Sequence, residues 1–400
     1  VAMTQYHWLL LLLLAVAFLL RVDFIYYILY VAVGVFLWSR WYTPRALGNL
    51  EARRTFRQRA FLGETVDVTL SLTNKSRLTI PWVQFSESVP PELRLEEATQ
   101  QVLTLPGRQS TSFTYHVKGL QRGYYRLGPL RLTSGDLFGL AKSRVGLLAP
   151  DYLTVYPRII SLTPLGLPSR LPFGTIGSRQ RLFEDPARPM GVREFRSGDS
   201  LRRMNWKASA HTQKLLVRTL EPAISLETII LLDLNLGGYE RRDRYTVIEW
   251  AIVLAASLAS HLVNERQAVG LRSNGIDPLR MHEDTRVYDE VTGRLSLQPN
   301  ANEGGYRPYM ATAIEPRNGR PHLMKILEQL ARLEARDTVP FVDWAPGACV
   351  NLSWGVTVLA ITAQGDARTA NTPHQLARSG FHPILLPVEP NAHFGPVRER

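Results

Sequence analysis

The stretch "ETIILLDLN", residues 227–235, decides the fold of the second half of the chain. Its centre is an unbroken apolar run, which is typical of a strand buried on both faces of a parallel sheet. Two helical patterns follow it, "RYTVIEWAIVLAASLASHLVNER" and "PHLMKILEQLARLEA", together with three more apolar segments, "AVGLRSN", "GVTVLAIT" and "HPILLPV". Because strands alternate with helices, we predict a doubly wound parallel α/β domain over residues 225–400.

The region from residue 45 to residue 150 has the alternation of β-strands instead. In "ETVDVTLSLTN" every second residue from 66 to 72 is apolar, and "STSFTYHVKGL" repeats this pattern around Tyr115. A period of two predicts strands that are buried on one face. Turn signals such as Gly128-Pro129 separate short strands of this kind. We therefore predict an immunoglobulin-like β-sandwich over residues 45–150.

The N-terminal region contains two apolar runs, residues 6–20 and 24–38, which carry no charged side chain. Each run is shorter than the roughly 20 residues of a full membrane span. We predict two short transmembrane helices in a tight hairpin over residues 1–44. The alternatives are a cleaved signal peptide, suggested by Ala15-Val16-Ala17, and a buried hairpin of a soluble protein. An arginine run follows the second apolar segment and predicts a cytoplasmic location for what comes after it: Arg40, Arg45, Arg53, Arg54, Arg57 and Arg59.

The positive charge of the chain is concentrated in one region. The formal net charge of the chain is +12. Residues 158–220 contain 12 Lys and Arg and 4 Asp and Glu, so this region contributes 12 − 4 = +8 of that charge. Such an excess favours an acidic partner, which can be nucleic acid, anionic lipid or protein. The single cysteine, Cys349, excludes an intramolecular disulfide and is interpreted as a core residue. The sequence contains no Gly-x-Ser-x-Gly, Gly-x-x-x-x-Gly-Lys or His-Glu-x-x-His motif, so we expect no enzymatic activity.

The predicted connector, residues 151–224, contains the basic stretch "GVREFRSGDSLRRMNWKASAHTQKLLVR", residues 191–218. Its first residues, "GVREF", predict a short strand. Asp199 is predicted to be the N-cap of a helix over residues 200–208. We predict that Leu201, Met204 and Ala208 line one face of this helix and that Trp206 packs beneath it. The segment "KLLVRTLE" is predicted to return as a strand of the α/β sheet.

Two interpretations of this basic stretch remain open. In the structural one, Arg193 or Arg202 forms a bidentate ion pair with Asp199 or Glu194. In the functional one, the excess of bases over acids forms a docking surface for an acidic partner. The candidate protein-binding residues are Arg193, Arg196, Gly198, Asp199, Arg202, Arg203, Trp206 and Lys207.

The order of these segments resembles that of the DUF58 family. The resemblance is carried by "RGYYRLGPLRLTSGDLFGL", by "REFRSGDSLRRMNWKASA" and by the strand ending in "LLDLN". The second of these has the pattern aromatic-x-x-Gly-Asp-x-x-Arg-x-x-x-Trp-x-x-Ser-Ala, here Phe195, Gly198, Asp199, Arg202, Trp206, Ser209 and Ala210. The resemblance implies a von Willebrand factor A-like carboxy-terminal domain. It also implies two partners, a MoxR-type AAA+ ATPase and a transglutaminase-like membrane protein, and no enzymatic activity.

The resemblance also implies a comparison with metal-binding von Willebrand factor A domains. In those domains an Asp-x-Ser-x-Ser loop follows the first strand, and its oxygen ligands suit Mg²⁺. Here the loop reads Asp-Leu-Asn-Leu-Gly, so Asp233 and Asn235 are the candidate ligands. The second loop has Arg320-Pro321 where a threonine is expected, and the acid of the third loop is displaced to Asp366. We therefore expect no cofactor, with weak Mg²⁺ binding as the alternative. The structural interpretation of Asp233 is a carboxylate that caps the following turn.

These patterns together favour a membrane-anchored, non-enzymatic adaptor that presents an A-like domain to a cytoplasmic partner. The expected location is a bacterial-type cytoplasmic membrane that the chain crosses more than once, with the bulk of the chain in the cytoplasm. The alternative is binding of nucleic acid or anionic lipid by residues 191–218. Only one aromatic residue accompanies the cations of the predicted helix, which argues against nucleic acid.

Overall fold

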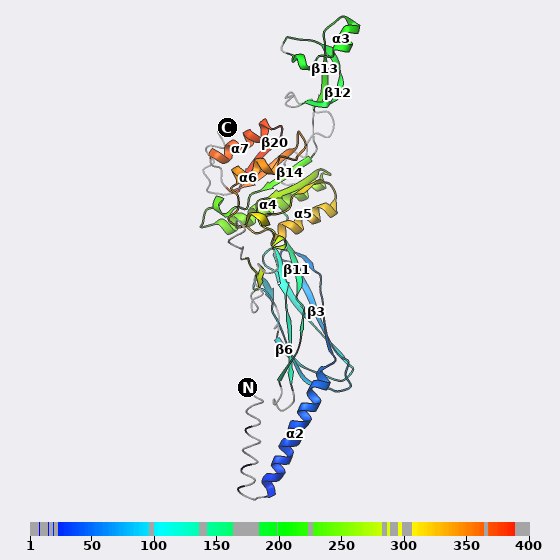
Figure 1. Cartoon of the computed structure of the whole chain (residues 1–400), viewed down its shortest axis with the longest axis vertical. Coiled ribbons are helices and arrows are strands. Elements are labelled where there is room, and N and C mark those ends of the chain that lie inside the picture. The colour runs from blue at the N-terminus through cyan, green and yellow to red at the C-terminus, as the bar shows by residue number, and fades with distance from the viewer. Residues whose placement is uncertain are drawn as a thin grey trace. The chain divides into compact units, whose positions relative to one another are not determined.

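In the computed structural model the chain forms two compact units, which are described one at a time (Figure 1). The first comprises Val1–Pro157 and His282–Gln298, and the second comprises Arg158–Met281 and Pro299–Arg400. The residues that the structure describes are 8, 15, 19, 23–95, 100–135, 142–162, 184–197, 199–222, 227–281, 286–288, 295–297, 306–363 and 367–388.

The first unit begins with the helix α2 (Asp23–Leu47), which is a single helix of 25 residues. The hairpin of two short helices was predicted over residues 1–44, and its second helix continues to Leu47, where its end packs on the β domain. The first apolar run lies outside the described residues, apart from Trp8, Ala15 and Leu19, which are helical. Within the described chain, α2 from Phe24 and a second helix are long and apolar enough to cross a membrane. The second one, α4 (Arg244–Asn264), packs in the core of the other unit, so length and apolarity alone are weak evidence of a membrane span.

The β domain that follows α2 consists of two antiparallel four-stranded sheets, β1-β3-β7-β5 and β10-β9-β4-β6, and of a three-stranded sheet β2-β11-β8, in which β11 is parallel to β2 and antiparallel to β8. The strands are β1 (Leu50–Thr55), β2 (Arg59–Phe61), β3 (Thr65–Asn74), β4 (Ile80–Glu87), β5 (Leu93–Leu95), β6 (Gln100–Leu105), β7 (Ser110–Gly119), β8 (Gly123–Leu127), β9 (Leu130–Gly135), β10 (Lys142–Leu148) and β11 (Asp151–Tyr156). The connector was predicted to begin at residue 151. Instead β11 pairs with β2 and β8, so the β domain extends to Tyr156.

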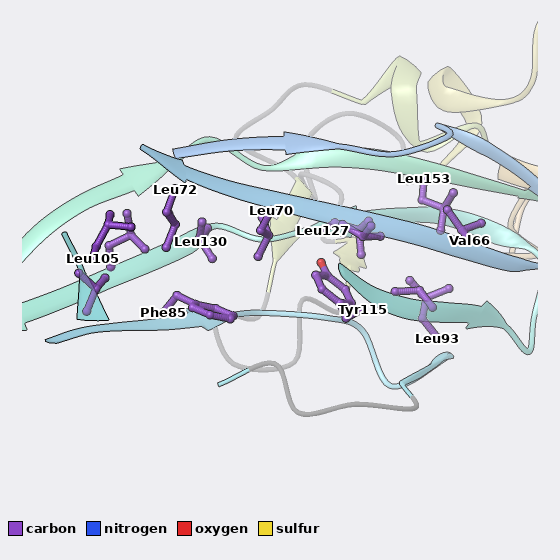
Figure 2. Close-up of a cluster of buried hydrophobic side chains, with 14 of the residues drawn as sticks. Val66, Leu70, Leu72, Phe85, Leu93, Leu105, Tyr115, Leu127, Leu130 and Leu153 are labelled. Carbon is purple, nitrogen blue, oxygen red and sulfur yellow. The ribbon is translucent and has the colours of Figure 1, made fainter. Parts of the chain in front are cut away.

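The core of the β domain lies between its sheets, as the alternating pattern predicts. The apolar residues of β3 are nearly or wholly buried, and Val68 lies opposite Tyr115 of β7 in the antiparallel register. Figure 2 shows Leu70 and Tyr115 from one sheet beside Phe85 and Leu130 from the other, all pointing into the shared interior. Two antiparallel sheets that face each other across one core are the arrangement of a β-sandwich.

A small hairpin, β16 (Arg286–Tyr288) and β17 (Leu295–Leu297), also belongs to the first unit, although its sequence lies within the predicted α/β domain. The guanidinium of Arg126 lies 4.7 Å from the centre of the Tyr288 ring. Tyr288 also has a hydrogen bond with Tyr152, which stacks on Tyr124 at 4.7 Å. Sequence neighbours therefore did not predict which domain this hairpin joins.

The second unit contains a mixed sheet in the order β18-β15-β14-β19-β20, in which β18 is antiparallel to β15 and the other neighbours are parallel. Ile229, Ile230, Leu231 and Leu232 of β14 are all 0% exposed, so both faces of this central strand are covered, as its unbroken apolar run predicts. Helices α4 and α5 pack on each other, and α6 and α7 do likewise. The elements are β14 (Glu227–Leu232), η3 (Leu236–Gly238), α4 (Arg244–Asn264), β15 (Ala268–Ser273), η4 (Pro278–Arg280), η7 (Arg307–Tyr309), β18 (Ile314–Arg317), α5 (Arg320–Arg332), α6 (Phe341–Ala348), β19 (Thr357–Thr362), α7 (Ala367–Arg378) and β20 (His382–Pro387).

Candidate functional site

The basic stretch forms a small structure of its own, which we call the basic module and define as residues 184–222. It consists of β12 (Glu184–Glu194), η2 (Leu201–Arg203), α3 (Trp206–Thr212) and β13 (Leu216–Pro222). The strands β12 and β13 pair with each other as an antiparallel hairpin. The segment "KLLVRTLE" was predicted to enter the α/β sheet. That prediction is wrong, because β13 takes β12 as its partner instead.

An ion pair holds the turn after β12. Arg193 donates through Nη1 and Nη2 to Oδ2 and Oδ1 of Asp199, at 2.7 and 2.6 Å, and the main-chain N–H of Arg196 donates to Oδ2 at 2.8 Å. These donors favour the ionised carboxylate, so the Arg193 guanidinium and then the Arg196 N–H hold the pKa of Asp199 at about 2. Of the pairings left open by the sequence, the structure therefore contains the bidentate one between Arg193 and Asp199.

The predicted N-cap is wrong. Asp199 closes the turn instead, and both of its oxygens are engaged by residues 193 and 196. The predicted helix over residues 200–208 is split into η2 and α3 at Met204, which is extended. Asn205 is the N-cap of α3, and its side-chain oxygen accepts from the N–H of Ala208 at 3.2 Å. An asparagine directly before the helical run was a cap signal that the sequence analysis missed.

The module has a small interior around Met204 and Val217, which are 6% and 2% exposed and bridge η2 to β13. Ser209 of α3 is also buried, and its hydroxyl accepts from the N–H of Leu216 at 2.9 Å. Trp206 was predicted to pack beneath the helix. That prediction is wrong, because its side chain is 66% exposed. Leu201, which was predicted to share a face with Met204 and Ala208, is likewise 66% exposed.

Several cations of the module remain free of carboxylates. Arg202, Lys207 and Arg218 are exposed, and no ion pair joins them to any described residue. Two acids of the module are already engaged, Asp199 by Arg193 and Glu194 by Lys214 at 2.7 Å. The side chains of Glu184, Asp185 and Glu221 lie outside what the structure describes. Lys214 also lowers the pKa of Glu194. The surface therefore combines uncompensated positive charge with an exposed tryptophan. Gly198 and the side chain of Arg203 lie outside the described residues.

The second candidate site lies where strands β14, β15 and β19 end, at the point where the order of the sheet reverses, which is the usual ligand position in open α/β sheets. Asp233 follows β14 and is 2% exposed. Its Oδ1 accepts from the side chain of Asn274 at 2.7 Å and from the N–H of Asn235 at 3.1 Å, and its Oδ2 accepts from the hydroxyl of Thr362 at 2.9 Å. Burial outweighs these hydrogen bonds and raises the pKa of Asp233.

The residues of this Asp233 cluster do not fit a Mg²⁺ site. The three described partners of the carboxylate are all donors, and a cation would have to displace them. The side-chain oxygen of Asn235, the second candidate ligand, accepts from the N–H groups of Gly237 at 3.2 Å and Thr338 at 3.4 Å. Within the described residues no group of three or more His, Cys, Asp or Glu is arranged for a metal, and Asp366 lies outside them. The contact with Asn235 is the turn-capping role that the structural interpretation expected.

Comparison with known proteins adds one distant relative and several remote structures. An uncharacterized protein of Bacillus subtilis (strain 168), YeaD, is 23% identical over 217 residues, which cover 53% of this chain and 52% of that protein. The chain thus spans about half the length of this curated relative. Part of alpha-2-macroglobulin from Escherichia coli is 16% identical with a TM-score of 0.25, covering 28% of this chain and 17% of that chain. A CARDB domain from Pyrococcus furiosus is 12% identical with a TM-score of 0.21, covering 26% of this chain and 91% of that chain. Similarities this low bear on neither fold nor function.

The match to a known protein family covers one continuous segment of the chain. It begins inside β12, includes the rest of the basic module together with Asp233, Asn235 and Asn274, and ends in α6. Thr362 of the Asp233 cluster lies outside it. Residues 191–342 match the family described as protein of unknown function DUF58.

Proposed function

We propose that this protein is a membrane-anchored, non-enzymatic adaptor whose basic module docks an acidic surface of a cytoplasmic protein. The observation that carries the proposal is the set of exposed, carboxylate-free cations beside an exposed Trp206. Tryptophan and arginine are the residues that most often contribute large shares of binding energy at protein interfaces. Unpaired charges at the rim of such a surface speed association with an oppositely charged partner.

The partner that we propose is a MoxR-type AAA+ ATPase, with a transglutaminase-like membrane protein as a further member of the assembly. We infer a von Willebrand factor A-like fold for the α/β domain. Numbered along the chain, its strands have the order 3-2-1-4-5 with an antiparallel edge strand, and this order supports the inference. We likewise infer an immunoglobulin-like class for the β domain, which its two facing antiparallel sheets support.

The membrane location is proposed from the apolar surface of α2 and the arginine-rich segment after it. We propose that the chain crosses a bacterial-type cytoplasmic membrane more than once, because a second uncharged run precedes α2. The arginine-rich segment supports a cytoplasmic location for the bulk of the chain. A reporter fused after Arg400 should be active in the cytoplasm. Activity outside the cytoplasm would overturn the orientation.

The docking proposal is tested with purified ATPase and the full chain in detergent. Reversing Arg202 and Lys207 to Glu should weaken binding, and the wild-type affinity should fall as salt rises. The matched control reverses Arg241 and Arg242 to Glu. These two arginines are exposed as well, but they belong to the loop before α4 and not to the basic module. Equal binding by the two double variants, with melting temperatures unchanged, would refute docking through the basic module.

A second candidate function is binding of single-stranded nucleic acid. The exposure of Trp206 favours it, because an exposed aromatic ring beside cations can stack on a base. If the variant with reversed Arg202 and Lys207 keeps its affinity for the ATPase but loses affinity for a labelled oligonucleotide, this second function replaces the first.

A further inference from the structure

The end of α2 is built into the β domain rather than joined to it by a linker (Figure 1). Ala46 and Leu47 are 1% and 8% exposed and belong to the hydrophobic core of the β domain. One turn earlier, the hydroxyl of Tyr42 donates to the carbonyl of Thr79 at 2.6 Å. If α2 spans a membrane, this end of the β domain must therefore lie at the depth where the helix leaves the bilayer.

Two turns lie at this end of the β domain and are locked to each other, the β3–β4 turn (residues 75–79) and the β6–β7 turn (residues 106–109). Asn74 is 0% exposed, and its side-chain nitrogen donates to main-chain carbonyls of both turns and of β6, at 2.8, 3.1 and 3.2 Å. The N–H of Arg108 donates to the carbonyl of Ser76 at 2.9 Å. The positions of both turns are thus fixed by buried hydrogen bonds.

These turns and the end of α2 carry a group of exposed cations, which we call the membrane-proximal cations. They are Arg40, Arg45, Lys75, Arg77 and Arg108. Among the described residues at this end the only acid is Glu51, which pairs with Lys75, so the local balance is 5 − 1 = +4. Among the described residues, no acid forms an ion pair with Arg77 or Arg108. The two turns therefore carry surplus positive charge at the end of the β domain that α2 enters.

A group of aromatic side chains of α2 lies near the same end of the β domain. Trp38 lies 5.4 Å from Trp41 and stacks on Tyr42 at 5.9 Å, measured between ring centres. Trp38 and Trp41 are 58% and 46% exposed, and the guanidinium of Arg45 lies 4.8 Å from the Trp41 ring centre. Tryptophan and tyrosine concentrate at the boundary between hydrocarbon and headgroups. The rings therefore place the membrane-proximal cations among the headgroups.

We propose that the membrane-proximal cations bind the headgroups of anionic phospholipids and so hold the β domain upright on the bilayer. This inference rests on the membrane anchoring proposed above, and it assigns a lipid surface as partner to a site separate from the basic module. Cations that are fixed near the headgroups gain from the negative potential of an anionic surface. Because the turns are rigid, little side-chain and loop ordering opposes binding.

The test uses the full chain in bilayers of phosphatidylcholine that contain a fixed fraction of brominated lipid, which quenches tryptophans near the membrane. Brominated phosphatidylglycerol should quench more than brominated phosphatidylcholine at equal mole fraction. The ratio of the two lipid-binding constants should fall about fivefold for each cation removed. The variant Arg77→Gln with Arg108→Gln should lose most of the preference, and 0.5 M salt should weaken it in the wild type.

The matched control is Arg57→Gln. Arg57 is also exposed, but it follows the far end of β1, roughly 20 Å along the strand from the turns, and its pairing with Glu64 spans 3.7 Å. It should keep the wild-type preference. Equal quenching by both lipids in the wild type, or a preference in the double variant as strong as in the wild type, would overturn the proposal. Quenching by neither lipid is a different result, because it would refute the membrane anchoring itself.

Discussion

The Asp233 cluster predicts opposite outcomes for two substitutions of one residue. Asp233→Ala removes the acceptor of three donors from the interior of the α/β domain, and each buried donor left unpaired costs about 1–3 kcal/mol. We expect a loss of about 3–6 kcal/mol in the free energy of unfolding, since some donors will find water. Asp233→Asn keeps one oxygen for the side chain of Asn274 and the N–H of Asn235. Its new amide can donate to the hydroxyl of Thr362, so we expect a change of about 1 kcal/mol or less.

The two variants should also differ in pH dependence. Burial raises the pKa of Asp233 above its ordinary value of 3.8. The folded state therefore binds the proton more tightly than the unfolded state, and the stability linked to this group is fully present below pH 3.8. It declines as pH rises through the raised pKa. Asp233→Asn cannot titrate, so its stability relative to the wild type should improve as pH rises from 4 to 7.

The single cysteine of the chain provides an assay that is specific to the α/β domain. Cys349 is 1% exposed in the core below α6, and burial raises its pKa to about 11, so the folded domain protects the thiol. Pulses of a thiol reagent across a urea series measure opening of this domain in the full chain. Asp233→Ala should raise the opening constant about 10²- to 10⁴-fold. Equal losses in both variants, or stabilisation of the wild type alone by millimolar Mg²⁺, would refute the reasoning and indicate a metal site.

Three further predictions concern the basic module and the β domain. Trp206→Ala should change stability by about 0.5 kcal/mol or less because the ring is exposed, whereas Met204→Ala should cost about 2 kcal/mol or more; hydrogen exchange of the module in the full chain measures both. The carboxyl of Asp199 should titrate near 2 by NMR, and Arg193→Gln should return it toward 3.8, so the stability linked to this carboxyl is present above about pH 4 and is lost as pH falls through 2. Arg54→Ala should destabilise the β domain by about 3–5 kcal/mol, seen as faster exchange of its strands, because it leaves a buried glutamate of β4 uncompensated.

The parts of the fold that follow from periodicity could be predicted from the sequence. The alternation in β3 and the unbroken apolar run of β14 determine which faces are buried, because burial is the main energetic requirement of each strand. The helices α4 and α5 follow from their apolar faces for the same reason. These properties depend on residues that are close in sequence, so a single chain is enough to show them.

The basic module could not be predicted in the same way, because distant partners determine its details. An acid before a helical run usually caps the helix, but Arg193 on β12 engages both oxygens of Asp199. A tryptophan usually packs in a core, but this module is small, and Met204 with Val217 occupies its interior. The ion pair was among the alternatives that the sequence allowed. The choice among them needed the antiparallel register of β12 and β13.

The hairpin of β16 and β17 has a consequence for how the protein is made. Tyr288 has a hydrogen bond with Tyr152 in the first unit, but the ribosome adds it 288 − 157 = 131 residues after that unit's first segment ends. At a translation rate of about 5–20 residues per second, the nascent β domain lacks this contact for about 7–26 s. A chain released after Pro157 would never form the contact between Tyr288 and Tyr152. The β domain therefore completes its folding only when the coding sequence of the other unit is more than half translated.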